Sequence, residues 1–439
     1  MNKKKTDWPA AFRSLRHQNF RRFFGGQIIS LIGTWMESVA QSWLVYRMTG
    51  SAALLGFVAF AGQVPVFLLA PIGGAVADRY SRHRILLITQ TASMLLALIL
   101  AALTLSHSVR IWHIYLLAAL LGVVNAFDIP TRQAFTSDLV GKEDLMNAIA
   151  LNSSTFNAAR MVGPAIAGII VAVVGEGWCF LINGVSYLAV IASLLKMQLK
   201  RPSRAPLLRS ALFHLMEGFH YVGRTGPIRA LLLLLGLVSL AVMPYAVLMP
   251  IFADKILHGG PSGLGLLMAA SGVGALVGAL SLAWHQGLRG LGRWITLSTI
   301  GFGASLILFS ISHSFWLSVF LLIPVGFFMM VGMAASNTLI QAMAPDHLRG
   351  RVMAVYSMMF MGMAPLGALL AGLLAERLGA PIAIALGGAA CIAGGWLFGR
   401  RLPALRDKAR EIILALEMSG GDPAQEMTGE DSLLPSQRP

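Results

Sequence analysis

Long apolar runs separated by short polar segments fill most of the sequence. The hydrocarbon core of a membrane is about 30 Å thick, so a helix that crosses it needs about 20 mostly apolar residues. Twelve runs meet this requirement, and we predict an all-α membrane protein with twelve transmembrane helices. The expected helices cover residues 23–46, 52–77, 85–106, 112–135, 145–174, 178–199, 228–252, 264–284, 294–311, 315–343, 352–374 and 382–399.

The composition excludes a soluble protein. Hydrophobic residues make up 56% of the chain and charged residues only 12%, whereas about 25% of the residues of a typical soluble domain are charged. The two cysteines, Cys179 and Cys391, lie far apart inside apolar runs, which argues against a disulfide framework or a metal site. We therefore expect no metal and no cofactor.

The placement of the charges predicts the orientation of the chain. A formal net charge of +15 would suggest nucleic acid as the partner of a soluble protein, but lipid headgroups explain it here. The even-numbered gaps between spans, counted with Lys196 and Arg229 at the span ends beside them, hold fifteen lysines and arginines, and the odd-numbered gaps hold four. Since such residues gather on the cytoplasmic side, both termini are expected in the cytoplasm, with the lipid bilayer as partner and no nucleic acid.

The chain divides into two similar halves. Glycines recur at a constant offset of 204 residues, as in Gly163 and Gly367 or Gly168 and Gly372. The offset spans six helices, an even number, so the repeats are parallel and predict two six-helix bundles around a central cavity. The expected domains are a cytoplasmic N-terminal segment at 1–22, a six-helix bundle at 23–199, a cytoplasmic linker with an amphipathic helix at 200–227, a second six-helix bundle at 228–402, and a cytoplasmic disordered tail at 403–439.

The loop at residues 73–84, between the second and third spans, resembles the signature loop of the major facilitator superfamily. A small residue at Gly74 allows close helix approach, and the carboxylate of Asp78 can pair with a cation or cap a helix N-terminus. In the second half Leu282 occupies the equivalent acidic position, so a charged latch should be asymmetric. The predicted gating residues of this loop are Gly74, Asp78, Arg79 and Arg82.

A second motif lies in the fifth span, where Gly163, Pro164 and Gly168 resemble the Gly-Pro motif of exporters in that superfamily. Small residues let helices pack closely, and proline kinks a helix where two halves must separate and rejoin. A gating role and a purely structural packing role both remain open. The resemblance favours efflux over uptake.

Four longer stretches of sequence resemble one particular group within the superfamily. Residues 35–46, 125–133, 337–341 and 345–351 look like the bacterial exporters grouped with the enterobactin exporter, the transmembrane secretion effector group. The resemblance implies a secondary active transporter of the bacterial inner membrane, not an enzyme. It would export a bulky amphiphilic small molecule, a siderophore or a drug-like compound, by alternating access and as a monomer. The absence of an ATP-binding motif favours an ion gradient as the energy source, and we expect proton antiport.

Charges inside a membrane span are costly and mark functional sites by default, and three such residues stand out, Glu37, Asp128 and Arg160. Burial disfavours the charged form of a carboxyl group, so Glu37 is interpreted as a proton-titrating group, with a static hydrogen-bonded acid as the alternative. Asp128 is expected to form a permanent ion pair, with Arg132 one turn away or with Arg160. Arg160 otherwise holds an anionic group of the substrate.

Neutral polar residues in the spans add to the candidate substrate and proton-coupling site. A single polar residue in a span more often forms an interhelical hydrogen bond than a contact with substrate. The members singled out are Gln41, Asn183, Asn337 and Gln341.

Three other functions compete with proton-coupled export. The chain could be a membrane sensor or assembly protein that keeps the fold without transport, a facilitator without ion coupling, or a membrane-embedded enzyme. The signature loop and the intramembrane charges argue against a sensor. An enzyme is disfavoured because the sequence has no histidine cluster, metal-spaced carboxylate pair or nucleotide-binding loop in its spans.

Overall fold

The computed structural model describes residues 10–197, 211–242, 244–284, 287–288 and 290–418, and within these ranges every regular element is a helix. The N-terminal half contains η1 (Ala10–Arg16), α1 (Gln18–Thr49), α2 (Ala52–Arg79), α3 (Arg82–Leu105), α4 (Ile111–Val174) and α5 (Glu176–Leu195). The linker helix α6 (Ala211–Arg224) precedes a C-terminal half made of α7 (Gly226–Ala241), α8 (Tyr245–Ile251), the π-helix η2 (Phe252–Ile256), α9 (Gly260–Trp284), α10 (Leu291–Ser310), α11 (Phe315–Ala342), α12 (Asp346–Leu378) and α13 (Ala380–Met418).

The predicted all-α membrane fold is confirmed. Eleven segments of the described residues are long and apolar enough to cross a membrane. The remaining predicted span lies in α1, which has 32 residues and is therefore about 48 Å long. Because α1 carries charged and polar side chains along its length, it is less apolar than the other eleven.

Glycines end the spans at equivalent places in the two halves. The fourth and fifth predicted spans form one long helix, α4, which breaks only at Gly141, where φ is 73°. Such a φ is readily adopted by glycine and rarely by other residues. Gly175 after α4 has φ 89° and Gly379 after α12 has φ 90°, and these two glycines are related by the offset of 204 residues. The matching backbone geometry agrees with a parallel repeat.

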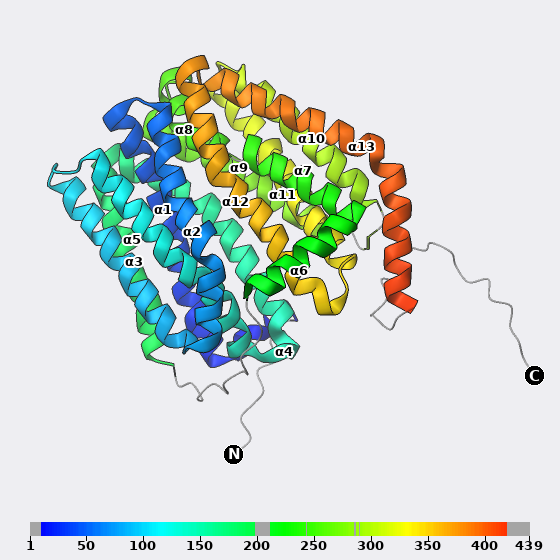
Figure 1. The fold of residues 1–439 in the computed structure, drawn as a ribbon. Helices are drawn as coiled ribbons and strands as arrows, with labels where there is room; N and C mark the ends of the chain where they lie inside the picture. Colours follow the sequence, from blue (N-terminus) through cyan, green and yellow to red (C-terminus); the bar gives the residue numbers. More distant parts are fainter. Residues whose placement is uncertain (1–9, 198–210, 243, 285–286, 289, 419–439) are drawn as a thin grey trace, which may run out of the picture.

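The two halves lie side by side, with α1–α5 in one group and α7–α13 in the other (Figure 1). They meet through the α2–α12 and α4–α9 pairs. Gly56 lies against Gly372, and Phe67 against Gly362, so α2 and α12 run antiparallel. We call the end that holds η1, the α2–α3 loop and the start of α12 the terminus end, and the end that holds Gly50 and the α12–α13 loop the far end.

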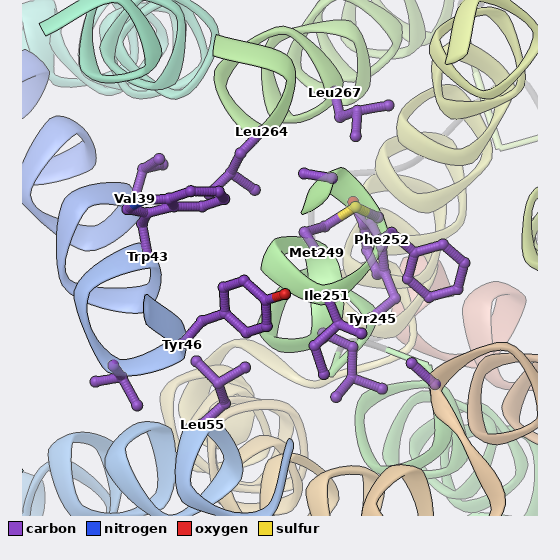
Figure 2. Packing of buried hydrophobic residues seen from close by; sticks show 14 of the residues in the cluster. Val39, Trp43, Tyr46, Leu55, Tyr245, Met249, Ile251, Phe252, Leu264 and Leu267 are labelled. Atoms are coloured by element: carbon purple, nitrogen blue, oxygen red, sulfur yellow. The ribbon is translucent and has the colours of Figure 1, made fainter. Parts of the chain in front are cut away.

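Apolar packing differs between these two ends. One continuous buried cluster at the far end joins both halves, from Trp43 and Leu55 in the N-terminal half to Phe252 and Leu264 in the C-terminal half (Figure 2). Towards the terminus end the buried residues instead form two clusters, one confined to each half. The halves therefore share a core at the far end and have separate cores at the terminus end.

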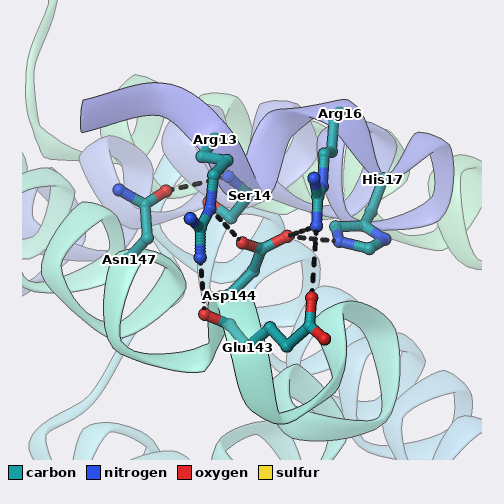
Figure 3. Close-up of polar contacts among 7 residues, drawn as sticks. All are labelled: Arg13, Ser14, Arg16, His17, Glu143, Asp144 and Asn147. Atoms are coloured by element: carbon teal, nitrogen blue, oxygen red, sulfur yellow. Dashed lines mark hydrogen bonds and ion pairs between the residues drawn. The ribbon is translucent and has the colours of Figure 1, made fainter. Parts of the chain in front are cut away.

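At the terminus end, η1 is fixed to the α4 break by a charged cluster (Figure 3). The buried carboxylate of Asp144 accepts from Arg13 at 2.5 Å, and it lies 2.8 Å from an Arg16 nitrogen and 2.7 Å from the His17 ring. Asp144 lies three residues after Gly141, so the cluster holds the chain where α4 breaks.

Two segments bear on the predicted domain limits. The helix α6 falls within the predicted linker and contacts the second half, where Glu217 pairs with Arg351 and the Tyr221 hydroxyl donates to the Met343 carbonyl at 3.1 Å. The helix α13 continues past the predicted bundle limit at 402, through Pro403 to Met418. Residues 198–210 and 419–439, which include part of the expected linker and tail, lie outside the described residues.

Candidate functional site

Glu37 lies inside the N-terminal half, between α1 and α5. Its side chain is buried and its carboxylate accepts a hydrogen bond from the Asn183 amide. The Ser186 hydroxyl donates to the Asn183 side-chain oxygen at 3.1 Å and so orients this amide. Gly33, one turn before Glu37, leaves the space that the Asn183 side chain fills. Two predicted site residues are thus brought into direct contact, and both belong to one half.

Asp128 occupies a separate, fully bonded position in α4. Its carboxylate accepts from the Thr89 hydroxyl and the Gln90 amide, each at 2.8 Å, and it lies 3.2 Å from an Arg132 nitrogen. Arg132 also donates to Gln27 at 3.1 Å. Of the two partners expected for Asp128, the structure places Arg132 beside it and directs Arg160 elsewhere. A carboxylate held by three donors is suited to a constant ion pair.

Arg160 projects from α4 towards the other half. Its guanidinium lies 3.5 Å from the Met329 sulfur of α11 and 5.8 Å from the centre of the Trp35 ring. Across the described ranges, no carboxylate is within ion-pair distance of Arg160. A cation flanked by an aromatic ring and a thioether suits an anionic group attached to an apolar body.

The remaining predicted polar residues lie on both halves. On α11 the Gln341 amide donates to the Asn337 side-chain oxygen at 3.1 Å, about two turns beyond Met329 along the helix. Gln41 is half-buried on α1, one turn beyond Glu37. The structure therefore pairs Asn337 with Gln341, and Glu37 with Asn183, but does not join these two pairs to Arg160.

The signature loop is anchored within its own half. Arg82 lies 3.2 Å from Asp78 and 2.8 Å from Asp138 of α4, while Arg79 lies over the Tyr80 ring. The Asp78 side chain is 73% exposed. Asp138 was not singled out from the sequence, because an acid in a polar gap is unremarkable until the fold places it beside Arg82.

The close helix approach assigned to Gly74 was wrong by one position. Gly73 packs against the backbone of Ala126 and Phe127 in α4, whereas a side-chain carbon at Gly74 would have nothing within 4 Å. On a helix, neighbouring residues point about 100° apart, so only one of the pair can face α4. Gly74 instead faces open space at the terminus end.

Glycines also bring the two halves together towards the far end. A side-chain carbon at Gly168 would lie 2.9 Å from Gly265 of α9, and one at Gly372 would lie 3.0 Å from Gly56 of α2. Gly163, by contrast, packs on α1 of its own half. The Gly-Pro motif therefore sits where α4 touches both its own bundle and the opposite one.

Hydrogen bonds between the halves reinforce this closure. The Tyr46 hydroxyl donates to the Asp254 carboxylate at 2.7 Å. The Ser51 hydroxyl and the Ala53 backbone amide donate to the Glu376 carboxylate at 3.0 and 3.1 Å. These residues were missed by the sequence reasoning, because partners separated by 208 and 325 positions carry no local pattern.

The two helical bundles, packed together at the far end, make this a multi-pass membrane protein with the major facilitator fold. The inward-open xylose transporter XylE from E. coli has the same fold, with a TM-score of 0.65 at 11% identity over 88% of this chain and 95% of that one. The family model for transmembrane secretion effectors matches residues 9–418. The chain belongs to the transmembrane secretion effector family, and the predicted family resemblance is confirmed.

Named relatives of the chain are transporters. The chain is 29% identical to the staphyloferrin A transporter of Staphylococcus aureus (strain NCTC 8325 / PS 47), over 81% of this chain and 89% of that protein. It is 29% identical to the multidrug efflux pump Tap of Mycolicibacterium fortuitum, over 79% and 87%. It is 27% identical to the enterobactin exporter EntS of Shigella boydii serotype 4 (strain Sb227), over 76% and 80%.

Proposed function

We propose that this protein exports a bulky amphiphilic small molecule, a siderophore or a drug-like compound, across the bacterial inner membrane by alternating access. The observation that carries the proposal is the asymmetric packing of the halves, with one shared core at the far end and separate cores at the terminus end. With both termini in the cytoplasm, this arrangement is closed towards the outside. It is the state in which a transporter would accept cargo from within the cell.

Cargo would enter between the halves from the terminus end and meet Arg160. The guanidinium there would hold an anionic group, while Trp35 and Met329 would contact the apolar body. For release, the far-end contacts would separate and the terminus end would close. Gly74, which faces open space in this state, offers a small surface for that closure.

Export would be coupled to protons through Glu37. A buried carboxyl group is easier to protonate than an exposed one, and the neighbouring Asn183 amide can donate to the charged form or turn its oxygen towards the protonated form. Asp128 is less suited to the task, since Arg132 and two neutral donors stabilise its charged state. The staphyloferrin A transporter and the enterobactin exporter among the relatives support a siderophore as cargo, and Tap supports drugs.

Transport into inside-out membrane vesicles tests this function. Wild-type vesicles with an acidic lumen should accumulate enterobactin, staphyloferrin A or ethidium, and the accumulation should stop when the pH gradient is collapsed. Glu37→Gln should abolish accumulation and retain exchange of cargo between the two sides. Glu411→Gln changes an exposed carboxylate on α13 and serves as the matched control.

Each contrary result has a distinct meaning. Equal accumulation by Glu37→Gln and the wild type would remove Glu37 from coupling. Equilibration without accumulation in the wild type would make the protein a facilitator. If none of the three compounds moves, the result counts against export and favours a non-transporting role.

A further inference from the structure

A cavity of about 520 Å³ lies within the C-terminal half at the terminus end. Its walls come from the start of α7, the start of α10, the end of α11 and the last turns of α13. Close contacts between Gly292 and Leu402, and between Gly399 and Thr296, hold α10 against α13 beside it. Pro403, the next residue after Leu402 on α13, also lines the cavity. The volume is in the range of small-molecule sites.

Basic and apolar side chains line this cavity together. Arg293, Arg406 and Arg410 are among the lining residues and are exposed, and Arg406 and Arg410 lie one turn apart on α13. In the part of the chain that the structure describes, none of the three has a carboxylate within ion-pair distance. The apolar part of the lining includes Leu231, Leu339, Met343, Phe398 and Leu402. The cavity thus offers unneutralised positive charge next to an apolar wall.

Aromatic side chains place the cavity at the level of the membrane interface. Trp396, one turn before Arg400, is 54% exposed, and the Arg400 guanidinium lies 4.0 Å above its ring. Trp294 at the start of α10 is also exposed. Exposed tryptophans gather where lipid headgroups meet the hydrocarbon core, and basic residues extend outward from them. The arginines of the cavity are therefore expected at headgroup depth.

We propose that this cavity binds one anionic glycerophospholipid, with its phosphate held by Arg293, Arg406 and Arg410. The upper part of an acyl chain would lie against Leu339, Met343 and Phe398. Basic pockets between helices on the cytoplasmic side are suited to anionic headgroups, whereas a soluble phosphate would leave the apolar wall uncovered. Cargo is a poor fit, because every lining residue belongs to the C-terminal half, whereas the proposed cargo path runs between the two halves.

Lipid retention by the full-length protein tests the proposal. The protein is equilibrated with phosphatidylcholine vesicles that contain phosphatidylglycerol, extracted gently, and analysed by native mass spectrometry. Loss of two arginines, in the variant Arg406→Gln/Arg410→Gln, should lower phosphatidylglycerol retention by about 10- to 30-fold. Arg401→Gln removes an exposed arginine of the same helix outside the cavity and should retain the lipid like the wild type.

A second variant distinguishes lipid bound inside the cavity from lipid attracted to the basic surface. Ala409→Leu keeps every arginine and adds bulk to a buried position of the lining, so it should also lower retention while the thermal unfolding midpoint stays that of the wild type. The proposal is overturned if either cavity variant retains the lipid normally, or if Arg401→Gln loses it equally. It is also overturned if glycerol 3-phosphate displaces the lipid at matched concentration, since the occupant would then be a soluble phosphate.

Discussion

The close approach of Gly168 to Gly265 makes a sharp prediction about the balance of conformations. A methyl group at Gly168 would lie 2.9 Å both from the Gly265 Cα atom and from the Pro261 carbonyl oxygen. Both neighbours are backbone atoms of the other half, so they cannot move aside as a side-chain end can. Gly168→Ala should therefore force α4 and α9 apart at this crossing.

The expected size of the effect follows from the cost of overpacking, about 1–3 kcal/mol. Since the contact exists only while the far end is closed, this cost falls on the closed state alone. The ratio of far-end-open to far-end-closed molecules should then rise by about 5- to 150-fold. Gly25→Ala is the matched control, because a side-chain carbon at Gly25 on α1 meets nothing within 4 Å.

Spin labels at Met48 and Arg377 report this change. Both residues are exposed and lie within three positions of the Ser51–Glu376 hydrogen bond; the buried native thiols, Cys179 and Cys391, would be replaced by alanine. Double electron–electron resonance should show a longer distance in Gly168→Ala than in the wild type or in Gly25→Ala. Identical distance distributions in all three proteins would show that the Gly168–Gly265 contact does not hold the far end closed.

Three further substitutions probe the charged groups. Arg160→Ala should weaken binding of an anionic cargo by about 10- to 150-fold, because a hydrogen bond to a charged group contributes about 1.5–3 kcal/mol, and Arg160→Lys should recover part of the affinity. Saturation kinetics in vesicles would measure this change, and an unchanged half-saturation concentration would count against a contact between Arg160 and the cargo. Asp128→Asn should lower stability by about 1–3 kcal/mol because Arg132 loses its counter-charge, which a thermal unfolding assay would detect; full stability would contradict a structural ion pair. Asp144→Asn should speed amide hydrogen exchange across residues 10–17, because the contacts of Asp144 with Arg13 and Arg16 of η1 and with His17 weaken. Unaltered exchange would show that η1 is held by other contacts.

Local patterns were sufficient to predict the architecture. The length and apolarity of the runs predict where helices cross the membrane, because each span must satisfy its own backbone hydrogen bonds. The same patterns could not place the end of α13, since its last turns lie beyond the apolar run and carry Arg406 and Arg410. Nor could they show that the break between the fourth and fifth spans is confined to a single residue, Gly141.

The site was predictable only where partners lie close in sequence or where burial itself is unusual. Asp128 and Arg132 are one turn apart, so their ion pair follows from helix geometry. Glu37 stood out as an acid in an apolar run, but its contact with Asn183 depends on how α1 crosses α5. Tyr46 and Asp254 come from different halves and meet only once both bundles have formed and docked.

Alternating access requires the far end to open before cargo can leave, and an experiment that locks this end tests the requirement. In the protein without native thiols, Met48→Cys and Arg377→Cys would be joined by a cross-linker that contains a reducible disulfide, and cargo uptake would be followed in inside-out vesicles. If export requires the far end to open, cross-linking stops transport, and reduction restores it to the rate of the uncross-linked protein. Transport that continues at the full rate while the far end is cross-linked would contradict alternating access in this protein.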